Sequence, residues 1–160
     1  MRETEIINNF DHQRLGKLYE SLMKLGNKSV SVGITASANQ SIEEGELNLA
    51  GLLAIHEFGT LNGNIPERAA LRTSVIKNVD AYIDFNKVNF KRVLREQISV
   101  DDALNLLGIK AASDVQNGIG NRTLELTPNK PSTIKSKGSD TPLIDTGQLR
   151  QSITHEIREA

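Results

Sequence analysis

Apolar residues recur at intervals of three and four between residues 11 and 25, which is the period of an amphipathic helix. The apolar stripe consists of Leu15, Leu18, Leu22 and Leu25. Asp11 is suited to cap the N-terminus of this helix, and Gly26 is suited to end it in a left-handed conformation. Burial of each leucine would contribute roughly 1.5–3 kcal/mol, so the stripe needs a partner.

Residues 29–35 alternate between small polar and branched apolar side chains, which predicts a half-buried strand. Its apolar residues are expected to face the first helix: Val30, Val32 and Ile34. Residues 152–158 alternate again and predict the closing strand, with one apolar side formed by Ile153, His155 and Ile157. Two strands this far apart, with helices between them, favour a single α+β domain in which a small, mostly antiparallel sheet packs against several helices.

The stretch 47–58 is short and apolar on most faces, and Gly59 follows it. It predicts a buried helix that ends at this glycine. After a turn at residues 62–64, Pro66 occupies the first position of a second predicted helix, which reaches about Asn78.

Residues 79–97 repeat apolar side chains between charged ones, and we interpret them as helical with a break near Asn86. Ser99 and Asp102 then form a capping-box pattern, with Asp in place of Glu, that opens a helix reaching Gly118. One face of this helix is apolar and consists of Ala103, Leu104, Leu107, Ala111 and Val115.

Two segments have no apolar period and are predicted to be mobile loops, residues 36–46 and residues 127–141. The first mixes small, amide and acidic residues, which gives it a negative tip. The second contains two prolines, a glycine and three lysines, and we expect it to become ordered on assembly.

The length of 160 residues suits one domain that spans residues 1–160. Aromatic residues make up only 4%, so the core must be aliphatic, and stacking platforms for nucleic acid are scarce. The net charge of -1 provides no global attraction to phosphate backbones. The absence of cysteine excludes disulfides and thiolate chemistry.

The N-terminus lacks the apolar stretch of a signal peptide, and no apolar run approaches the ~18 residues that a membrane span needs. We therefore expect a chain that stays in a cytoplasm, with no membrane partner. Nothing in the composition implies a cofactor.

The triplet Asp145-Thr146-Gly147 is the local signature of an aspartic protease. Such an enzyme needs two carboxylates about 3 Å apart that share a proton, so a chain with one motif must dimerise. Only residues 148–160 follow the triplet, too few for the flaps and the second glycine motif of that fold. We favour a structural interpretation, in which Asp145 or Thr146 accepts backbone N–H groups at the start of a turn over residues 147–151.

His56 and Glu57 are adjacent, which is not the one-turn spacing of a metal-binding helix. We favour a hydrogen bond for His56, at a helix end or between subunits, over a role as ligand or base. Arg68 and Arg72 lie four residues apart, a spacing suited to clamping phosphates or a neighbour's carboxylates, with a solvated helix face as the alternative.

A small basic loop is formed by Lys130, Lys135 and Lys137. It could touch DNA phosphates, but without aromatic or base-reading groups the contact would be non-specific.

Two stretches together resemble a family of tailed-bacteriophage morphogenesis proteins: "LAIHEFGT" (residues 53–60) with "NIPERAALR" (residues 64–72), and "TIKSKGSDTPLIDTGQLRQSI" (residues 133–153). These are the neck or tail-completion proteins, also called virion morphogenesis or head–tail joining proteins. The resemblance extends over most of the chain, because the order and spacing of the helices, strands and motifs also match. The family commonly has Pro-Phe where this chain has Ala69-Ala70.

The resemblance implies a non-enzymatic virion protein, assembled in the bacterial host cytoplasm, that forms a ring, most often a hexamer, at the head–tail interface. The implied partners are further copies of itself and other neck and tail proteins, namely a connector or stopper, a tail terminator, and the tail tube or sheath. DNA passing through the ring is a non-specific contact. The alternatives are a tail terminator, a head-side stopper, or a hydrolase that uses Asp145 or His56.

We expect ring contacts from residues 59–72 and residues 127–149, with Arg68 or Arg72 pairing with acids on the next subunit. The candidate interface residues are His56, Glu57, Phe58, Ile65, Arg68, Arg72, Lys135, Lys137, Asp145, Gln148, Leu149 and Arg150.

Overall fold

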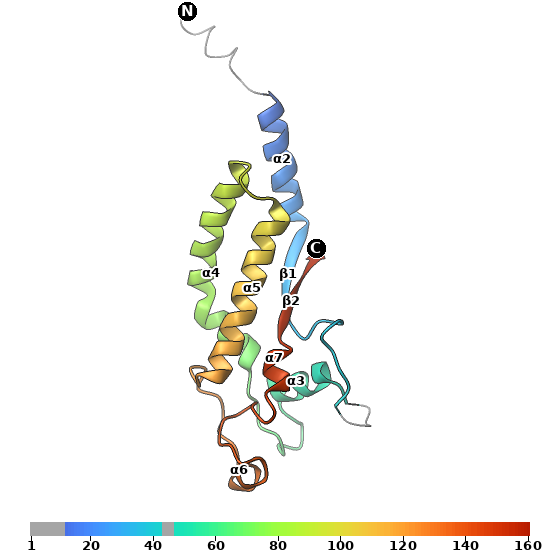
Figure 1. Cartoon of the computed structure of the whole chain (residues 1–160), viewed down its shortest axis with the longest axis vertical. Coiled ribbons are helices and arrows are strands. Elements are labelled where there is room, and N and C mark those ends of the chain that lie inside the picture. Colours follow the sequence, from blue (N-terminus) through green and yellow to red (C-terminus); the bar gives the residue numbers. More distant parts are fainter. Residues whose placement is uncertain (1–11, 43–46) are drawn as a thin grey trace, which may run out of the picture.

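The computed structural model describes residues 12–42 and 47–160. Its elements in chain order are α2 (His12–Gly26), β1 (Lys28–Gly33), α3 (Leu49–Phe58), α4 (Ala70–Leu94), α5 (Val100–Gly120), α6 (Pro131–Lys137), α7 (Gln148–Gln151) and β2 (Thr154–Glu159). The expected α+β class is confirmed. Figure 1 shows α4 and α5 side by side along the long axis, α2 at one end of the molecule, and α3, α6 and α7 at the other.

The sheet consists of β1 and β2, which pair antiparallel with Val30 opposite Ile157 and Val32 opposite His155. Both strands pack against α5. Val30 and Ile157 contact the core as predicted, but the helix that covers them is mainly α5 and not the first helix of the chain. A two-stranded sheet is at best marginally stable alone, so α5 supplies the surface that stabilises it.

The helix α5 contributes to both core clusters of the protein. One cluster consists of Val93, Val100, Ala103 and Leu104. The other combines the second half of α5 with buried residues from several segments: Leu49, Leu53, Ala70, Ala112, Val115, Ile119, Leu124, Leu143, Leu149 and Ile153. The predicted capping box is confirmed, because Ser99 and Asp102 exchange side-chain-to-backbone hydrogen bonds of 3.0 Å at the start of the helix.

The two helices expected over residues 66–97 form one unbroken helix, α4, which begins at Ala70. The predicted break near Asn86 and the predicted start at Pro66 are therefore wrong. Residues 66–69 instead run past the end of α3, where the Arg68 N–H donates to the carbonyl of His56 at 2.7 Å. The preference of proline for the first position of a helix predicted a start at Pro66. It could not show that a contact with α3 would keep residues 66–69 outside the helix.

The prediction that the apolar stripe of the first helix is buried is wrong for most of its length. α2 contains no buried residue, and Leu15 and Leu22 are 48% and 55% exposed. Only Leu25 packs against a core cluster. The helix continues through Gly26, which lacks the positive φ that was expected, while Asp11 lies outside the described residues.

The segment 127–141, which was expected to be a loop without core contacts, contains α6. Pro131 begins this helix and Gly138, in a left-handed conformation, ends it. The loop expected at residues 36–46 is described only as far as residue 42, where Ser41 forms a bridge to Asn48. None of the described helices is both long and apolar enough to cross a membrane.

We predict that Gly108→Ala lowers the free energy of unfolding by about 1–3 kcal/mol. A Cβ at residue 108 would lie 2.1 Å from Cδ2 and 2.9 Å from Cβ of His155, so the imidazole must leave its 2.7 Å hydrogen bond to Asn105. The matched control is Gly16→Ala in α2, where no atom of the described residues outside the neighbouring helix backbone lies within 4 Å of the new Cβ. This change should stabilise the helix by up to about 1 kcal/mol. Urea denaturation measures both. Equal effects of the two substitutions would contradict this packing of β2 on α5.

Candidate functional site

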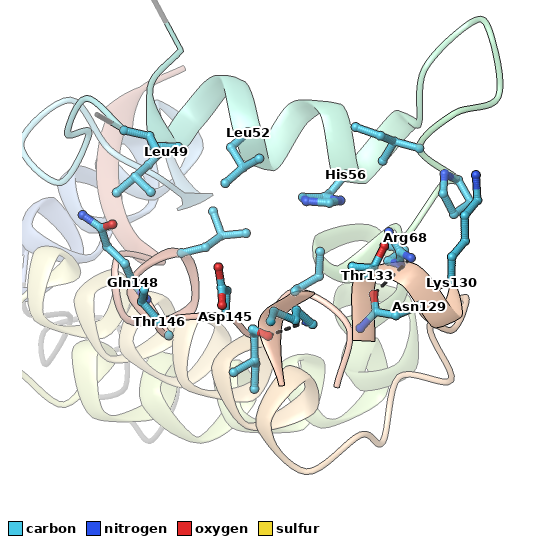
Figure 2. A pocket seen from close by; sticks show the side chains of 18 of the residues that line it. Leu49, Leu52, His56, Arg68, Asn129, Lys130, Thr133, Asp145, Thr146 and Gln148 are labelled. Carbon is cyan, nitrogen blue, oxygen red and sulfur yellow. Dashed lines mark hydrogen bonds between the residues drawn. The ribbon is translucent and has the colours of Figure 1, made fainter. Parts of the chain in front are cut away.

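The two sequence stretches that carry the resemblance fold together around one cleft of about 670 Å³. One wall comes from α3 and the segment after it, and the other comes from residues 129–149 (Figure 2). Seven of the twelve candidate residues line the cleft: His56, Ile65, Arg68, Lys137, Asp145, Gln148 and Leu149. The lining also includes apolar side chains that sequence analysis did not select, such as Leu52 and Ile144.

Glu57 lies behind the cleft wall and has a structural contact within the chain. Its buried carboxylate accepts hydrogen bonds from the backbone N–H groups of Leu71 and Arg72, at 3.1 and 3.0 Å. These donors belong to the first turn of α4, which has no cap from its own N-cap residue, Ala69. A carboxylate at this position satisfies orphan N–H groups and interacts favourably with the helix dipole. Glu57 therefore attaches α3 to α4.

Arg68 joins the two walls of the cleft. Its side chain donates from Nε to the carbonyl of Thr127 at 2.7 Å, and from Nη2 to the carbonyl of Pro128 at 3.1 Å and Oδ1 of Asn129 at 3.3 Å. The residue is only 7% exposed. These contacts use the guanidinium inside the chain, and the ion pair with a neighbouring subunit that was expected for Arg68 or Arg72 stays a prediction.

The exposed Arg72 instead forms an ion pair with Glu67. It is the more exposed of the two arginines.

Lys130 also joins the two walls of the cleft, whereas Lys137 bonds within its own wall. Lys137 Nζ donates to the carbonyls of Thr141 and Ile144, at 2.6 and 2.5 Å, and burial is the main cause that lowers its pKa. Lys130 donates to the carbonyl of Asn64 at 3.1 Å. Two of the three lysines of the predicted DNA-contacting loop, Lys130 and Lys137, are thus hydrogen-bonded to backbone carbonyls of their own chain.

The imidazole of His56 points into the cleft (Figure 2). Its Nδ1 is buried without a hydrogen-bond partner among the described residues. Burial lowers the pKa of His56, and the positive charges of Arg68 and Lys137 lower it further. The lowered pKa favours the neutral imidazole, and Nδ1 is a polar atom that a bound group could satisfy.

The Asp145-Thr146-Gly147 triplet forms a turn, as the structural interpretation predicted. Gly147 has a φ of 83° before α7, and the Gln148 N–H donates to Oγ1 of Thr146 at 3.3 Å. Asp145 is exposed at the rim of the cleft. Among the lining residues that the structure describes, it is the only carboxylate, so no second acid stands beside it to share a proton.

The remaining candidates lie away from the cleft lining. Phe58 is 71% exposed at the end of α3, Lys135 is exposed on α6, and Arg150 lies against Gly120 of α5. The cleft has three cations in its lining, Arg68, Lys130 and Lys137, against the single carboxylate of Asp145.

Within residues 12–42 and 47–160, no group of three or more His, Cys, Asp or Glu side chains could hold a metal ion. Comparison with models of protein families, with curated proteins and with solved structures found no match for this chain.

We predict that Arg68→Ala lowers the free energy of unfolding by about 2–4 kcal/mol, because three hydrogen bonds to a buried charged donor are lost. Arg72→Ala, which removes an exposed ion pair, should change it by less than about 0.5 kcal/mol. Chemical denaturation followed by circular dichroism measures both values. If the two alanine variants were equally stable, Arg68 would not be the connection between the walls.

We also predict that the protein loses stability as the pH falls from about 7 to about 5, and that His56 accounts for part of the loss. Because the folded pKa of His56 lies below its ordinary value of 6.5, the unfolded chain takes up a proton that the folded protein does not, and acid favours unfolding. His56→Gln should reduce this slope. Denaturation midpoints of the two proteins across the pH range provide the test, and parallel curves would contradict the assignment.

Proposed function

We propose that the protein is a structural virion subunit of a tailed phage that forms a ring at the head–tail interface and completes or joins the tail. The single observation that supports this proposal is that two motif segments, about seventy residues apart in the sequence, fold into the walls of one cleft. The resemblance to the tail-completion family was carried by these same segments.

In this proposal the cleft is a contact surface and not a reaction centre. Its interior is apolar, through residues such as Leu49, Leu52 and Ile65, and its lining has an excess of positive charge. Those properties suit a segment of a neighbouring neck or tail protein that carries apolar and acidic side chains. Arg68 and Lys130 join the two walls by hydrogen bonds, so the cleft is formed before the segment arrives.

Lys135 is exposed on α6, whereas Lys130 and Lys137 are hydrogen-bonded within the chain. Lys135 is therefore the candidate for non-specific contact with DNA in the ring lumen.

A tail terminator or a head-side stopper would require the same kind of small ring-forming subunit.

One arrangement favours a second candidate function. His56 and Asp145 both line the cleft (Figure 2), so the hydrolase alternative has its two residues in one site. In that case Asp145→Asn and His56→Ala would each abolish a hydrolytic activity and leave ring assembly and tail binding unchanged.

We predict that the purified protein forms a ring, or a specific cap on the ends of isolated phage tails. Light scattering measures the particle mass, and negative-stain images show the ring or the cap. A hexamer would have about six times the chain mass of 17.6 kDa. Asn64→Trp and Gln148→Trp should prevent capping, because both residues are exposed at the cleft and a large side chain there would block it.

The matched control is Ser136→Trp, an exposed residue of α6 that does not line the cleft; it should cap tails normally in negative-stain images. A wild-type protein that remains monomeric and has no affinity for tails or capsids would overturn the proposal.

A further inference from the structure

Arg68 carries a buried positive charge that no carboxylate among the described residues balances. The residue is 7% exposed, and its three hydrogen bonds end on two carbonyl oxygens and one amide oxygen, all of them neutral. Burial lowers the pKa of Arg68, and no acid of the described chain raises it. Buried charges are normally paired with an opposite charge. An anion from outside the described chain would therefore meet an unmatched cation here.

Part of this guanidinium is open to the cleft. A guanidinium has five N–H donors, and the hydrogen bonds inside the chain use only those of Nε and Nη2. Nη1 has no acceptor among the described residues and is not enclosed by them. Because Arg68 lines the cleft, the two donors of Nη1 remain for a bound group.

His56 contributes a second unsatisfied atom to the same part of the cleft. Its Nδ1 is enclosed without a partner among the described residues, and an enclosed polar atom without a hydrogen bond costs free energy. The imidazole points into the cleft, and Figure 2 shows Arg68, Asn129 and Lys130 on one side of it. A neutral imidazole with its proton on Nδ1 can donate to an anion.

The charges of the cleft are separated along its length. Figure 2 shows Asp145 toward the end that contains Gln148, on the other side of His56 from Arg68 and Lys130. Lys130 Nζ donates to the carbonyl of Asn64, and an ammonium group has three donors. We call His56, Arg68 and Lys130 the basic end of the cleft. It combines several free donors with no carboxylate of the described lining.

The surroundings of the basic end favour a carboxylate on a polypeptide over a phosphate of DNA. Duplex DNA carries a negative charge every ~1.7 Å along its axis, so it needs cations along a whole groove. Here the cations are confined to one end, and Leu52, Ile65 and Asp145 line other parts of the cleft. The volume of about 670 Å³ lies within the ~300–1,000 Å³ of sites for small ligands, which suits a few residues of a peptide.

We propose that the basic end of the cleft is a subsite for one carboxylate of a bound polypeptide. Arg68 Nη1, His56 Nδ1 and Lys130 Nζ donate to the carboxylate oxygens. Apolar side chains beside the acidic residue contact Leu52 and Ile65. The inference deepens the proposed function, and it rests on that function only for the identity of the polypeptide as a neck or tail protein.

A matched pair of peptides that differ in one charge tests the subsite on the full chain. The probes are acetyl-Leu-Glu-Leu-amide and acetyl-Leu-Gln-Leu-amide, titrated into the labelled protein and followed by NMR at low salt. We expect the Glu peptide to bind about tenfold more tightly, because hydrogen bonds to an ionised acceptor are roughly twice as strong as neutral ones. Equal affinities, or no binding of either peptide, would overturn the subsite.

The imidazole of His56 provides a local readout of the same titration. The charges that face it are Arg68, and Lys137 and Asp145 from the opposite wall, while Glu57 is turned toward α4. A bound carboxylate favours the imidazolium and should raise the pKa of His56, which its Cε1–H signal reports. The Gln peptide is the control and should leave this pKa unchanged. A pKa that responds equally to both peptides would contradict the contact.

Two lysine variants separate the subsite from a general effect of positive charge. Lys130 lines the cleft, whereas Lys135 is exposed on α6 outside the lining. Lys130→Met should weaken binding of the Glu peptide severalfold and leave the Gln peptide unchanged, whereas Lys135→Met should change neither. Both positions are exposed, so the fold should survive, and circular dichroism verifies this. Equal losses in the two variants would overturn the subsite.

Competition distinguishes the carboxylate from a phosphate. Inorganic phosphate and a short DNA duplex should not displace the Glu peptide when present at the same concentration. Displacement by the duplex, with the His56 signal moving as it does for the peptide, would assign the basic end to nucleic acid and overturn the proposal.

The subsite and the proposed function fail separately. Selective binding of the Glu peptide by a protein that does not cap tails supports the subsite and removes the neck function. Tail capping by a protein that does not distinguish the two peptides removes the subsite alone.

Discussion

The apolar face of α5 is the constraint on which the rest of the structure depends. The sheet has only two strands, and such a sheet is not stable in water by itself. α5 packs against both strands and against α4, so one helix joins the two ends of the sequence. β1 follows the first described helix and β2 ends the chain, yet their pairing is stabilised through residues such as Ala103 and Leu104 in between.

The cleft depends on a second set of contacts, in which charged side chains satisfy backbone groups. Glu57 caps α4 from α3, Arg68 binds the carbonyls of residues 127 and 128, and Lys137 binds those of Thr141 and Ile144. Each contact satisfies backbone N–H or carbonyl groups that have no partner within a helix or strand. Charge in this region therefore has a structural role. Arg68 is buried, and Asp145 is the only carboxylate among the described lining residues.

The cleft and the stripe of α2 share one feature, because each exposes apolar side chains. The cleft combines an apolar interior with excess positive charge, and α2 exposes leucines of its apolar stripe. Soluble monomers rarely leave large contiguous apolar patches open. A subunit that functions inside an assembly has these patches covered by its neighbours, so the exposed residues of the isolated chain and the proposed ring are consistent with each other.

Local signals in the sequence were sufficient to predict the elements whose cause is local. The Ser99–Asp102 capping box, the end of α3 at Gly59, the presence of both strands and the turn at Gly147 are all confirmed, because the signal for each lies in a few neighbouring residues. Tertiary structure decided the rest. The start of α4 at Ala70 depends on Glu57 and on the path of residues 66–69 past α3, and the formation of the cleft depends on a contact between Arg68 and residues about sixty positions away. The stripe of α2 shows the difference most clearly. Its amphipathic period can be read from the sequence, but whether the stripe is covered depends on which surfaces lie within its reach, and the described residues leave most of it exposed.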